Sequence, residues 1–517
     1  MAGARPSRFK SALLSVPDSA GTTEPLVWSD EQLAIHEWFA TGTGNLLVRA
    51  RAGTSKTTTA LEGIRGAPER QILICAFNKK IADELTARLN NPNATAKTLH
   101  ALGFAAIRRY ADHFKVLDGS ERANDLAGMA ARSWKQDHKG VDVPWEIKRL
   151  VALLCTKARE MTPIGYDETS MIALAHQFNY LPDEGWGNRW TVEHVANLTL
   201  RAMDHAAAYQ RGGIDFADMI FLPLVKGWLS PTYDLVVVDE AQDMNLAQLT
   251  ICERVNRGRM AVIGDDRQAI YGFRGADTGS LDRLKRSLRA AELPLTTTYR
   301  CGRDIVEHAQ LLVPDITARA GAPLGEVTDK SVADLMAEVA PGDFVLSRLN
   351  APLVGLTLAL LAQRVPAYMA GRDIGQGIET VLRLLKLPKG LPCDEMLVRL
   401  EAWRKRRVTT LANRGLLDQV DRLNDQADMI KELSGTALDA DDVVEQCREL
   451  FKDADPSTRV MCSSIHKAKG LEASRVWVLT DTLYRRGRTT EEENLEYVAI
   501  TRAKTALFLV RGVGGAR

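Results

Sequence analysis

The chain has 517 residues, of which 45% are apolar and 26% are charged, and its formal net charge is +1. This length is too great for one hydrophobic core and predicts three or four domains, while the composition is ordinary for a globular protein. The small net charge excludes a general basic field, so any nucleic-acid contact must come from local grooves.

Cysteine usage and hydropathy narrow the class of protein further. The seven cysteines are scattered and form no C-x-x-C pair, which argues against a zinc site and a disulfide framework and fits a reducing compartment. No apolar run reaches the roughly 18 residues that span a bilayer, so we expect no membrane segment and a cytoplasmic location. Residues 1–24 are rich in Ser and Ala and predict a flexible tail, with a transit peptide as the alternative.

Short aliphatic runs bounded by polar loops recur along the chain, and most of them precede helical patterns. This alternation predicts an α/β fold with buried parallel strands. The runs form one cluster before about residue 283 and another after it, which predicts two stacked α/β domains. The predicted strands are residues 45–49, 71–76, 235–238, 260–263, 343–347, 476–479 and 506–510.

Two helical stretches with few strand signals interrupt these clusters and predict insertions into the α/β cores. The second carries a basic run, Arg404 to Arg407, for which a solvated helix face and a contact with a DNA backbone are equally open. The predicted parts are a first α/β domain at 25–103 and 212–283, its insertion at 104–211, a second α/β domain at 284–374 and 456–517, and its small insertion at 375–455.

The segment from Ala50 to Thr58 has the layout of a phosphate-binding loop, because it joins a predicted strand to a helix. In such loops backbone N–H groups face the phosphates; Lys56 would neutralise them and the Thr57 hydroxyl would ligate Mg²⁺. An ordinary strand-to-helix turn is the alternative, since the pattern GxxxxGK[ST] fails at two positions, Ala50 and Ser55. The remaining residues expected around the phosphates are Ala52, Gly53, Thr54, Ser55 and Thr58.

Ser55 stands where the pattern asks for glycine. We expect hydrolysis of ATP to survive this departure, because a serine with φ below zero still offers its N–H group to a phosphate.

A pair of acids supplies the second half of a nucleotide site. Asp239 and Glu240 directly follow the apolar run 235–238. The first carboxylate can hold Mg²⁺ through water and the second can polarise the attacking water. A solvated strand end is the alternative, and the presence of Lys56 and Thr57 in the same chain favours the nucleotide site.

At this point the sequence resembles the superfamily 1 DNA helicases of the UvrD/Rep/PcrA type, over residues 28 to 510. The matching segments are Trp28 to Gln32, Ala76 to Ala82, Thr98 to Gly103, Gly264 to Ala276, Thr298 to Arg300, Ser464 to Glu472 and Tyr497 to Arg502. The resemblance implies two RecA-like parallel-sheet domains with helical insertions, here with a reduced accessory insertion.

The resemblance also implies roles for single residues. Gln32 would read adenine, Tyr299 would stack on it, and Glu472 would hold the ribose. Gln268 would sense the γ-phosphate, and Arg300 and Arg502 would act as arginine fingers from the second domain. The implied DNA contacts are Phe77, Asn78, Lys79, Thr98, His100, Tyr271, Phe273, Arg274 and His466; for Phe77, Tyr271 and Phe273, core packing is the alternative.

The implied activity is that of an ATP- and Mg²⁺-dependent helicase or translocase, 3′-to-5′ in polarity, that acts on single-stranded DNA and on single/double-strand junctions in repair, recombination or replication. Because the accessory insertion is small, we expect modest duplex opening or opening that depends on a protein partner. Two alternatives stay open: a translocase that strips proteins from single strands, and a regulatory DNA-binding subunit, for instance of a phage-defence complex, that no longer hydrolyses ATP.

Overall fold

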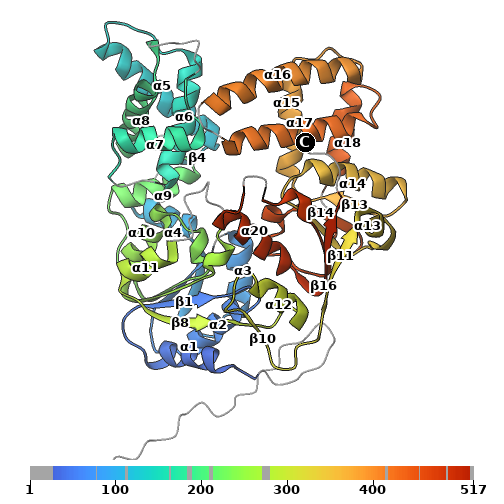
Figure 1. Cartoon of the computed structure of the whole chain (residues 1–517). Coiled ribbons are helices and arrows are strands. Elements are labelled where there is room, and N and C mark those ends of the chain that lie inside the picture. Colours follow the sequence, from blue (N-terminus) through green and yellow to red (C-terminus); the bar gives the residue numbers. More distant parts are fainter. Residues whose placement is uncertain are drawn as a thin grey trace, which may run out of the picture.

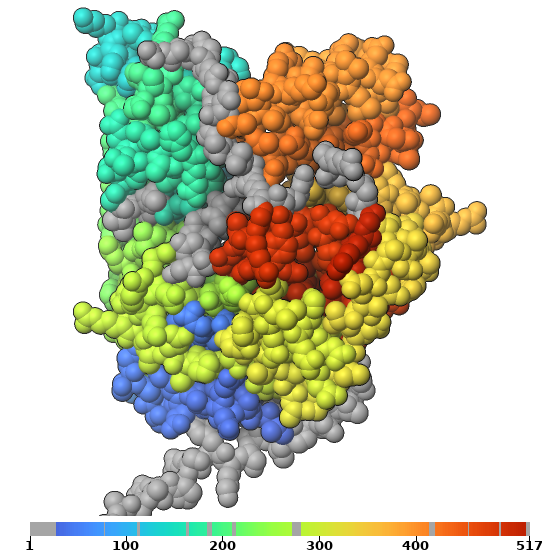
Figure 2. All heavy atoms as spheres, in the orientation of Figure 1, coloured from blue at the N-terminus to red at the C-terminus, as the bar shows by residue number. Residues whose placement is uncertain are grey.

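The computed structural model describes residues 27–76, 78–110, 114–161, 165–182, 189–208, 213–270, 280–413, 417–452, 454–484 and 487–512. Two α/β cores lie at the base, and a helical insertion rises from each of them on the same side (Figure 1). The two insertions form separate lobes in the space-filling view (Figure 2). Within the described residues, no helix is both long and apolar enough to cross a bilayer.

The first core is a six-stranded sheet in the order β3-β2-β6-β7-β1-β8, in which every pair of neighbours is parallel. Its strands are β1 (Leu46–Ala50), β2 (Ile72–Ala76), β3 (Ala94–Thr98), β6 (Tyr233–Val238), β7 (Asn256–Gly264) and β8 (Ala291–Leu295). Its helices are α1 (Asp30–Thr41), α2 (Lys56–Arg65), α3 (Lys79–Arg88), α4 (Leu99–Tyr110), α9 (Phe216–Val225), α10 (Leu246–Val255) and α11 (Ser280–Leu288).

Helices cover both faces of this sheet, which explains its continuous aliphatic strands. In β6, Val236 and Val238 belong to one buried cluster, whereas Leu235 and Val237 belong to another. Successive strand residues point to opposite faces, so an apolar run without alternation is what two covered faces require.

The first insertion lies between α4 and α9 and is mainly helical. It comprises β4 (Lys115–Val116), α5 (Gly119–Asp137), α6 (Trp145–Met161), α7 (Glu168–Phe178), α8 (Val192–Ala207) and β5 (Gly213–Ile214), with β4 and β5 paired in parallel. Leu126, Ala130 and Trp134 recur every four residues along α5 and are buried, which gives that helix one apolar face.

The second core is a six-stranded parallel sheet in the order β11-β16-β15-β12-β14-β13. Its strands are β11 (Glu326–Ser331), β12 (Phe344–Ser347), β13 (Ala367–Met369), β14 (Val460–Ser464), β15 (Ala473–Leu479) and β16 (Ala503–Arg511), with helices α12 (Arg303–Gln310), α13 (Val332–Glu338), α14 (Ala351–Ala362), α19 (Ile465–Ala468) and α20 (Thr490–Ile500). The accessory insertion contributes α15 (Arg372–Leu384), α16 (Cys393–Asn413), α17 (Leu417–Ser434) and α18 (Ala440–Leu450). The predicted α/β class with two parallel sheets and helical insertions is confirmed.

The first core extends further along the chain than the sequence predicts. β8 lies beyond residue 283, where we expect the first domain to end, yet it pairs with β1 along its whole length. Immediately after β8 the chain crosses to the second core. At the crossing, the N–H and hydroxyl of Thr296 donate to the Glu31 carboxylate at 2.8 and 2.7 Å. A short parallel pair, β9 (Thr297–Thr298) with β10 (Thr317–Ala318), follows. The crossing is therefore anchored to α1.

Candidate active site

Three neighbouring strands of the first sheet deliver the phosphate loop, Asp239 and a further acid, Asp265, to one edge. The loop of residues 51–55 follows β1, Asp239 follows β6, and Asp265 follows β7, which lies between them in the sheet. The carboxyl ends of parallel strands meet at one edge, where ligands of open α/β sheets bind. The strand order therefore brings these three segments side by side.

Ser55 is the N-terminal cap residue of α2 and has φ 59° and ψ 37°, the left-handed region. The expectation that Ser55 has φ below zero is therefore wrong. The turn needs a left-handed residue immediately before the helix to aim its N–H groups at one point, and the chain adopts that conformation although serine is not glycine. The Ser55 side chain is exposed and caps no helix N–H.

At Gly53 the phosphate loop packs closely against the second domain. A Cβ added there would lie 2.4 Å from Thr298 Oγ1 and 2.6 Å from Arg300 Cβ, and its φ is 72°. The Gly53 carbonyl also accepts a hydrogen bond from the Tyr299 N–H at 2.8 Å. Only glycine satisfies both the conformation and the space.

Thr57 and Asp239 lie together, as the sequence predicts for a magnesium site. The Thr57 hydroxyl donates to the Asp239 carboxylate at 2.7 Å. A hydroxyl and one carboxylate are few protein ligands, and Mg²⁺ bound to nucleotide phosphates ordinarily keeps waters and uses just such a set. The residues present therefore fit Mg²⁺ carried with a nucleotide.

The charges around Lys56 are arranged to keep it ionised. Its ammonium lies 3.6 Å from the Glu240 carboxylate. Burial opposes the charge, but Glu240, Asp265 and Asp239 together raise the pKa of Lys56 above its ordinary value. Burial also acts against the Glu240 carboxylate, yet Lys56 and then Lys469 hold the pKa of Glu240 below its ordinary value. Burial and the neighbouring Glu240 raise the pKa of Asp239.

The predicted adenine-binding residues come together from both domains. The Tyr299 hydroxyl donates to Gln32 Oε1 at 3.0 Å, and Gln32 Nε2 donates to Thr59 Oγ1 at 3.0 Å. Gln32 also closes a capping box with Ser29 at the start of α1. Thr58, by contrast, accepts a hydrogen bond from Arg88 at 3.0 Å.

The two predicted arginine fingers occupy different settings. Arg300 forms an ion pair with Glu472 at 2.6 Å and donates to the Thr501 carbonyl at 3.0 Å. Arg502 is buried and donates to the carbonyls of Val498 and Leu471 at 2.9 and 3.1 Å. Burial and then the nearby Arg300 lower the pKa of Arg502 to about 10. Arg300 is thus beside the phosphate loop, whereas Arg502 is held within the second domain.

Gln268 occupies a buried link between the two domains. Its side-chain amide donates to Asp265 Oδ2 at 2.7 Å, and its backbone carbonyl accepts from Lys469 Nζ at 2.8 Å. Lys469 also forms an ion pair with Asp243 at 2.7 Å. One lysine of the second domain therefore holds two segments of the first, both next to the nucleotide site.

Sequence reasoning missed two further links across the interface. The Ala52 N–H donates to the buried Tyr497 hydroxyl at 2.9 Å. Arg51 lies within the phosphate loop and binds both oxygens of Asp315 at 2.8 and 2.7 Å, while its third nitrogen lies 2.8 Å from Asp266. A large cation inside a phosphate loop is the signal that could have drawn attention to Arg51.

The described residues among the predicted DNA contacts lie at or just after the carboxyl ends of strands β2, β3 and β14. Asn78 accepts from the Ile81 N–H at 2.9 Å and caps α3, Lys79 is exposed, and Thr98 accepts from the Ala101 N–H at 3.1 Å. Their DNA-binding roles stay predictions. Phe77, Tyr271, Phe273 and Arg274 lie outside the described residues.

The two predicted histidine contacts are uncharged at neutral pH. His100 packs edge-on against Phe216 with ring centroids 5.8 Å apart, and burial lowers its pKa. Burial and then the cations Arg348 and Arg422 lower the pKa of His466 to about 3. Both imidazoles can therefore offer hydrogen bonds rather than charge.

Known proteins match the chain at both of its α/β cores. Residues 28–289 match the model of the UvrD/REP helicase N-terminal domain, and residues 459–510 match that of the UvrD-like helicase C-terminal domain. F-box DNA helicase protein 1 of Schizosaccharomyces pombe is 24% identical over 90% of this chain and 55% of its own length. DNA helicase IV of Escherichia coli (strain K12) is 25% identical over 57% of this chain and 49% of its own length.

The chain thus spans about half the length of these two relatives. A probable DNA helicase of Mycoplasma pneumoniae is 24% identical over 90% of this chain and 80% of its own length. The first family model covers 28–289, the residues that supply the phosphate loop, the paired acids and Gln268. The chain belongs to the UvrD/REP helicase family.

Proposed function

We propose that the chain is an ATP-dependent motor that moves along single-stranded DNA and separates strands at single/double-strand junctions. The observation that carries the proposal is the closeness of the phosphate loop to the second domain, where Gly53 has room for no side chain beside Thr298 and Arg300. Hydrolysis that depends on this apposition can be converted into domain motion.

The proposed hydrolysis divides the work among named residues. Lys56 and the loop N–H groups would bind the β- and γ-phosphates, and Thr57 and Asp239 would hold the Mg²⁺ that neutralises them. Water would attack the γ-phosphorus while the bond to the ADP oxygen breaks, and Glu240 would accept the proton of that water. Bound Mg²⁺ supplies Lewis-acid stabilisation of the phosphate charge.

Arg300 would complete the site when the domains are closed. Arginine fingers contribute about 10³- to 10⁵-fold to rates of phosphoryl transfer. Arg300 already lies beside the loop, whereas Arg502 would have to exchange its carbonyl partners for phosphate. Closure would therefore promote hydrolysis, and loss of the γ-phosphate would weaken the contacts that keep the domains together.

Gln268 and Lys469 would couple this cycle to the bound DNA. Gln268 donates to Asp265 beside the nucleotide site, and Lys469 of the second domain donates to the Gln268 backbone carbonyl. Aromatic side chains hold bases by stacking without reading their identity, so alternate closure and opening becomes stepping along a strand. We propose 3′-to-5′ polarity from the resemblance of residues 264–276 to that branch, and action in DNA repair, recombination or replication.

The test is phosphate release as single-stranded DNA is titrated into the protein. We expect strong stimulation by DNA and its loss in Lys56→Ala, with Lys452→Ala as the control, because Lys452 is an exposed lysine whose recorded partner is Glu449. Strand displacement from substrates with 3′ or 5′ tails then reads the polarity. DNA binding by the wild type without stimulated hydrolysis would instead favour the regulatory-subunit alternative.

The small accessory insertion favours a second candidate within the same class. Its described helices, α15 to α18, lie within residues 372 to 450. So short an insertion would offer little surface to hold a duplex. We propose that the motor displaces bound protein more readily than it opens long duplexes. Release of streptavidin from a biotinylated single strand, compared with unwinding of a long duplex by the same monomer, tests this; robust unwinding would contradict it.

A further inference from the structure

The turn that follows β7 ends in the second core. We call residues 266–269 the Gln268 turn, because they carry the predicted γ-phosphate sensor. Ile270, the next residue, is fully buried and belongs to the hydrophobic cluster that also holds Leu495 and Val498 of α20. The turn therefore follows a strand of the first core but ends inside the packing of the second.

Asn494 of α20 holds both ends of the Gln268 turn. Its Nδ2 group donates to the Asp266 carbonyl at 3.3 Å and to the Ala269 carbonyl at 3.1 Å. A primary amide has two N–H groups, so this arrangement uses both of them. The side chain is buried, and its Oδ1 atom accepts no hydrogen bond from the described residues. An unpaired buried acceptor costs free energy, so the donor group is what suits an asparagine to this position.

Two further hydrogen bonds tie the Gln268 turn to other parts of the second core. Lys469, which follows α19, donates to the Gln268 backbone carbonyl at 2.8 Å. The guanidinium of Arg267, within the turn, donates to the Leu312 carbonyl just after α12. Three of the four backbone carbonyls of the turn thus accept from the second core, namely those of Asp266, Gln268 and Ala269.

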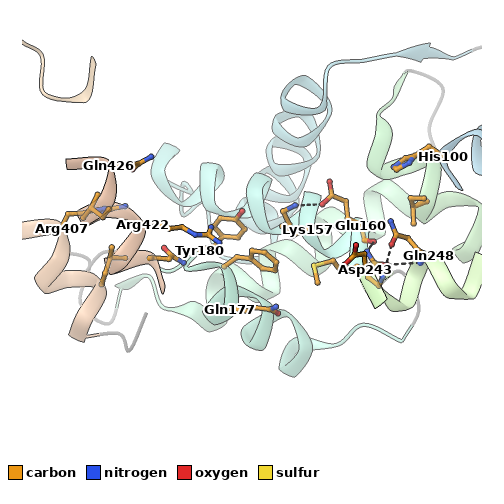
Figure 3. Close-up of a pocket in the computed structure, with 17 residues that line it drawn as sticks. His100, Lys157, Glu160, Gln177, Tyr180, Asp243, Gln248, Arg407, Arg422 and Gln426 are labelled. Atoms are coloured by element: carbon orange, nitrogen blue, oxygen red, sulfur yellow. Dashed lines mark hydrogen bonds and ion pairs between the residues drawn. The ribbon is translucent and has the colours of Figure 1, made fainter. Parts of the chain in front are cut away.

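Asn494 is the contact whose removal isolates this tie. Lys469 also forms an ion pair with Asp243 at 2.7 Å, and Asp243 lines a cavity of about 760 Å³ that residues of both helical insertions also line (Figure 3). A change at Lys469 would therefore disturb that cavity as well. Both donor bonds of Asn494, by contrast, end on the Gln268 turn.

The residue before the turn is fixed to the first core instead. Asp265 is fully buried, and its N–H donates to Gln242 Oε1 at 3.0 Å. Gln268 thus lies between Asp265, which the first core holds, and Ile270, which is packed in the second. A change in the angle between the two cores would have to be absorbed within these few residues, and it would move the Gln268 side chain relative to the phosphate loop.

We propose that Asn494 is a positioning residue, which ties the Gln268 turn to the second core and makes the approach of Gln268 to the γ-phosphate depend on closure of the domains. The inference rests on the proposed function, since it takes Gln268 as the group that senses the γ-phosphate of ATP. Asn494 would act on hydrolysis only through the turn, because both of its N–H groups are already used there. Without Asn494, the domains could close while Gln268 stays out of place.

Hydrogen exchange tests the tie without an assay of activity. Asn494→Leu keeps most of the side-chain volume and removes the donor, so the N–H groups of Gln268 and Ala269 should exchange about 5- to 100-fold faster. Asn494→Asp, which is nearly isosteric and places an acceptor against the two carbonyls, should have the same effect. Unchanged exchange in β7 and β15 shows that both cores stay folded in these variants.

The matched control for exchange is Asn91→Leu. Asn91 Nδ2 donates to the Ile64 carbonyl at 2.7 Å, so this substitution also removes a donor to a backbone carbonyl, but within the first core. We expect the control to leave exchange of the Gln268 turn as in the wild type. Wild-type exchange of the turn in both Asn494→Leu and Asn494→Asp would overturn the proposal.

Steady-state hydrolysis distinguishes positioning from a merely structural role. At saturating single-stranded DNA, Asn494→Leu should lower kcat for ATP about 5- to 100-fold, whereas KM for ATP should stay within about twofold, because Asn494 would not touch the nucleotide. In a chain that carries Gln268→Ala, Asn494→Leu should have little further effect on kcat, because its influence passes through Gln268. Effects that multiply in the double variant would contradict this route.

The outcomes separate this proposal from the proposed function. If phosphate release by the wild type responds to DNA but Asn494→Leu behaves as Asn91→Leu does in both assays, the motor function stands and the positioning role is wrong. If the wild type hydrolyses ATP without a response to DNA, the motor function fails. Exchange of the Gln268 turn and the comparison with Gln268→Ala in the absence of DNA then still decide whether Asn494 positions Gln268.

Discussion

Ser55 occupies a backbone conformation that favours glycine, at the point where the phosphate loop enters α2. A left-handed residue that carries a Cβ costs roughly 1–2 kcal/mol. Since the Ser55 side chain is exposed, the cost comes from the backbone and not from crowding. The loop therefore keeps the geometry of a phosphate site at some expense of stability.

Replacing Ser55 with glycine should raise the free energy of unfolding by about 1 kcal/mol, and Ser55→Val should lower it, because β-branched residues tolerate positive φ least. Hydrogen exchange of α2, which reads the local free energy of unfolding, measures both changes. We expect Ser55→Gly to change kcat for ATP by less than about tenfold, since the N–H groups stay in place. A rise in kcat by orders of magnitude would show that the native serine impairs the site.

His36 links stability to pH. It is 6% exposed within α1, and burial lowers its pKa from 6.5 to about 4. Between these two values the unfolded chain binds the proton and the folded chain does not, so the free energy of unfolding should fall as the pH drops from 6.5 to 4. His36→Gln should flatten this part of the profile, as read from unfolding midpoints at several pH values. An unchanged slope would contradict the prediction.

Among the elements, α6 and α9 are joined by a buried ionic network. Arg159 of α6 is fully buried and lies 2.8 Å from Asp215 and 2.7 Å from Asp218, which also accepts from Arg122 at 2.8 Å. Removing one member leaves its partners charged and without a counter-ion, and this is costly in a protein interior.

Arg159→Ala should therefore destabilise the first insertion by about 3–5 kcal/mol. Hydrogen exchange of α6 and α9 measures this locally, which avoids treating several domains as one unfolding unit. Arg201→Ala is the control, because Arg201 makes a partly exposed ion pair with Asp137 and should cost about 1 kcal/mol or less. Equal exchange in the two variants would show that the network contributes little.

The elements that sequence alone identifies are the buried ones. All seven predicted strands appear in the two sheets, because their aliphatic runs are covered on both faces. Five strands of these two sheets escaped prediction. β3, β8 and β11 end their sheets and carry polar residues, and β8 even contains Pro294. β13 has only three residues, and the apolar run of the interior strand β14 ends in two serines. Strands that are polar or short lack the long apolar pattern that makes the other strands visible.

The residues of the candidate site also fall into those that the sequence predicts and those that it does not. Lys56, Thr57 and Asp239 could be predicted, since short motifs after strands carry a local signal. The partnership of Arg51 with Asp315, and of Ala52 with Tyr497, joins residues hundreds of positions apart. No local pattern specifies such pairs, because they depend on how the two domains pack.

At the scale of the whole molecule, Arg51 and Asp315 form an ionic link between the phosphate loop and the second domain. Both oxygens of Asp315 bind the guanidinium, whose side chain is 7% exposed, while the carboxylate is 51% exposed. Asp265 and Asp266 hold the same guanidinium from the first domain. Arg51 therefore bridges the two domains.

Asp315→Ala should shift the molecule toward an open arrangement and raise the KM for ATP more than it changes kcat, because one of the links that hold the two domains together would be lost and nucleotide binding would have to supply more of the free energy of closure. Fluorescence transfer between dyes on the two domains reads the opening, and a double-mutant cycle with Arg51→Ala should give a coupling energy of about 0.5–3 kcal/mol. Additive effects of the two substitutions would refute the bridge. Asp329→Ala, at an exposed pair with Arg511, serves as the control.

The anchored crossing after β8 places the predicted arginine finger Arg300 at the junction of the two domains. Arg300 lies only five residues beyond Leu295, and Thr296 between them is held by Glu31. Arg300 also donates to the Thr501 carbonyl at 3.0 Å, so Arg502 is its neighbour within the second domain. A rotation of that domain about the crossing would therefore carry both guanidiniums away from a γ-phosphate together, and both contacts would be lost in one step.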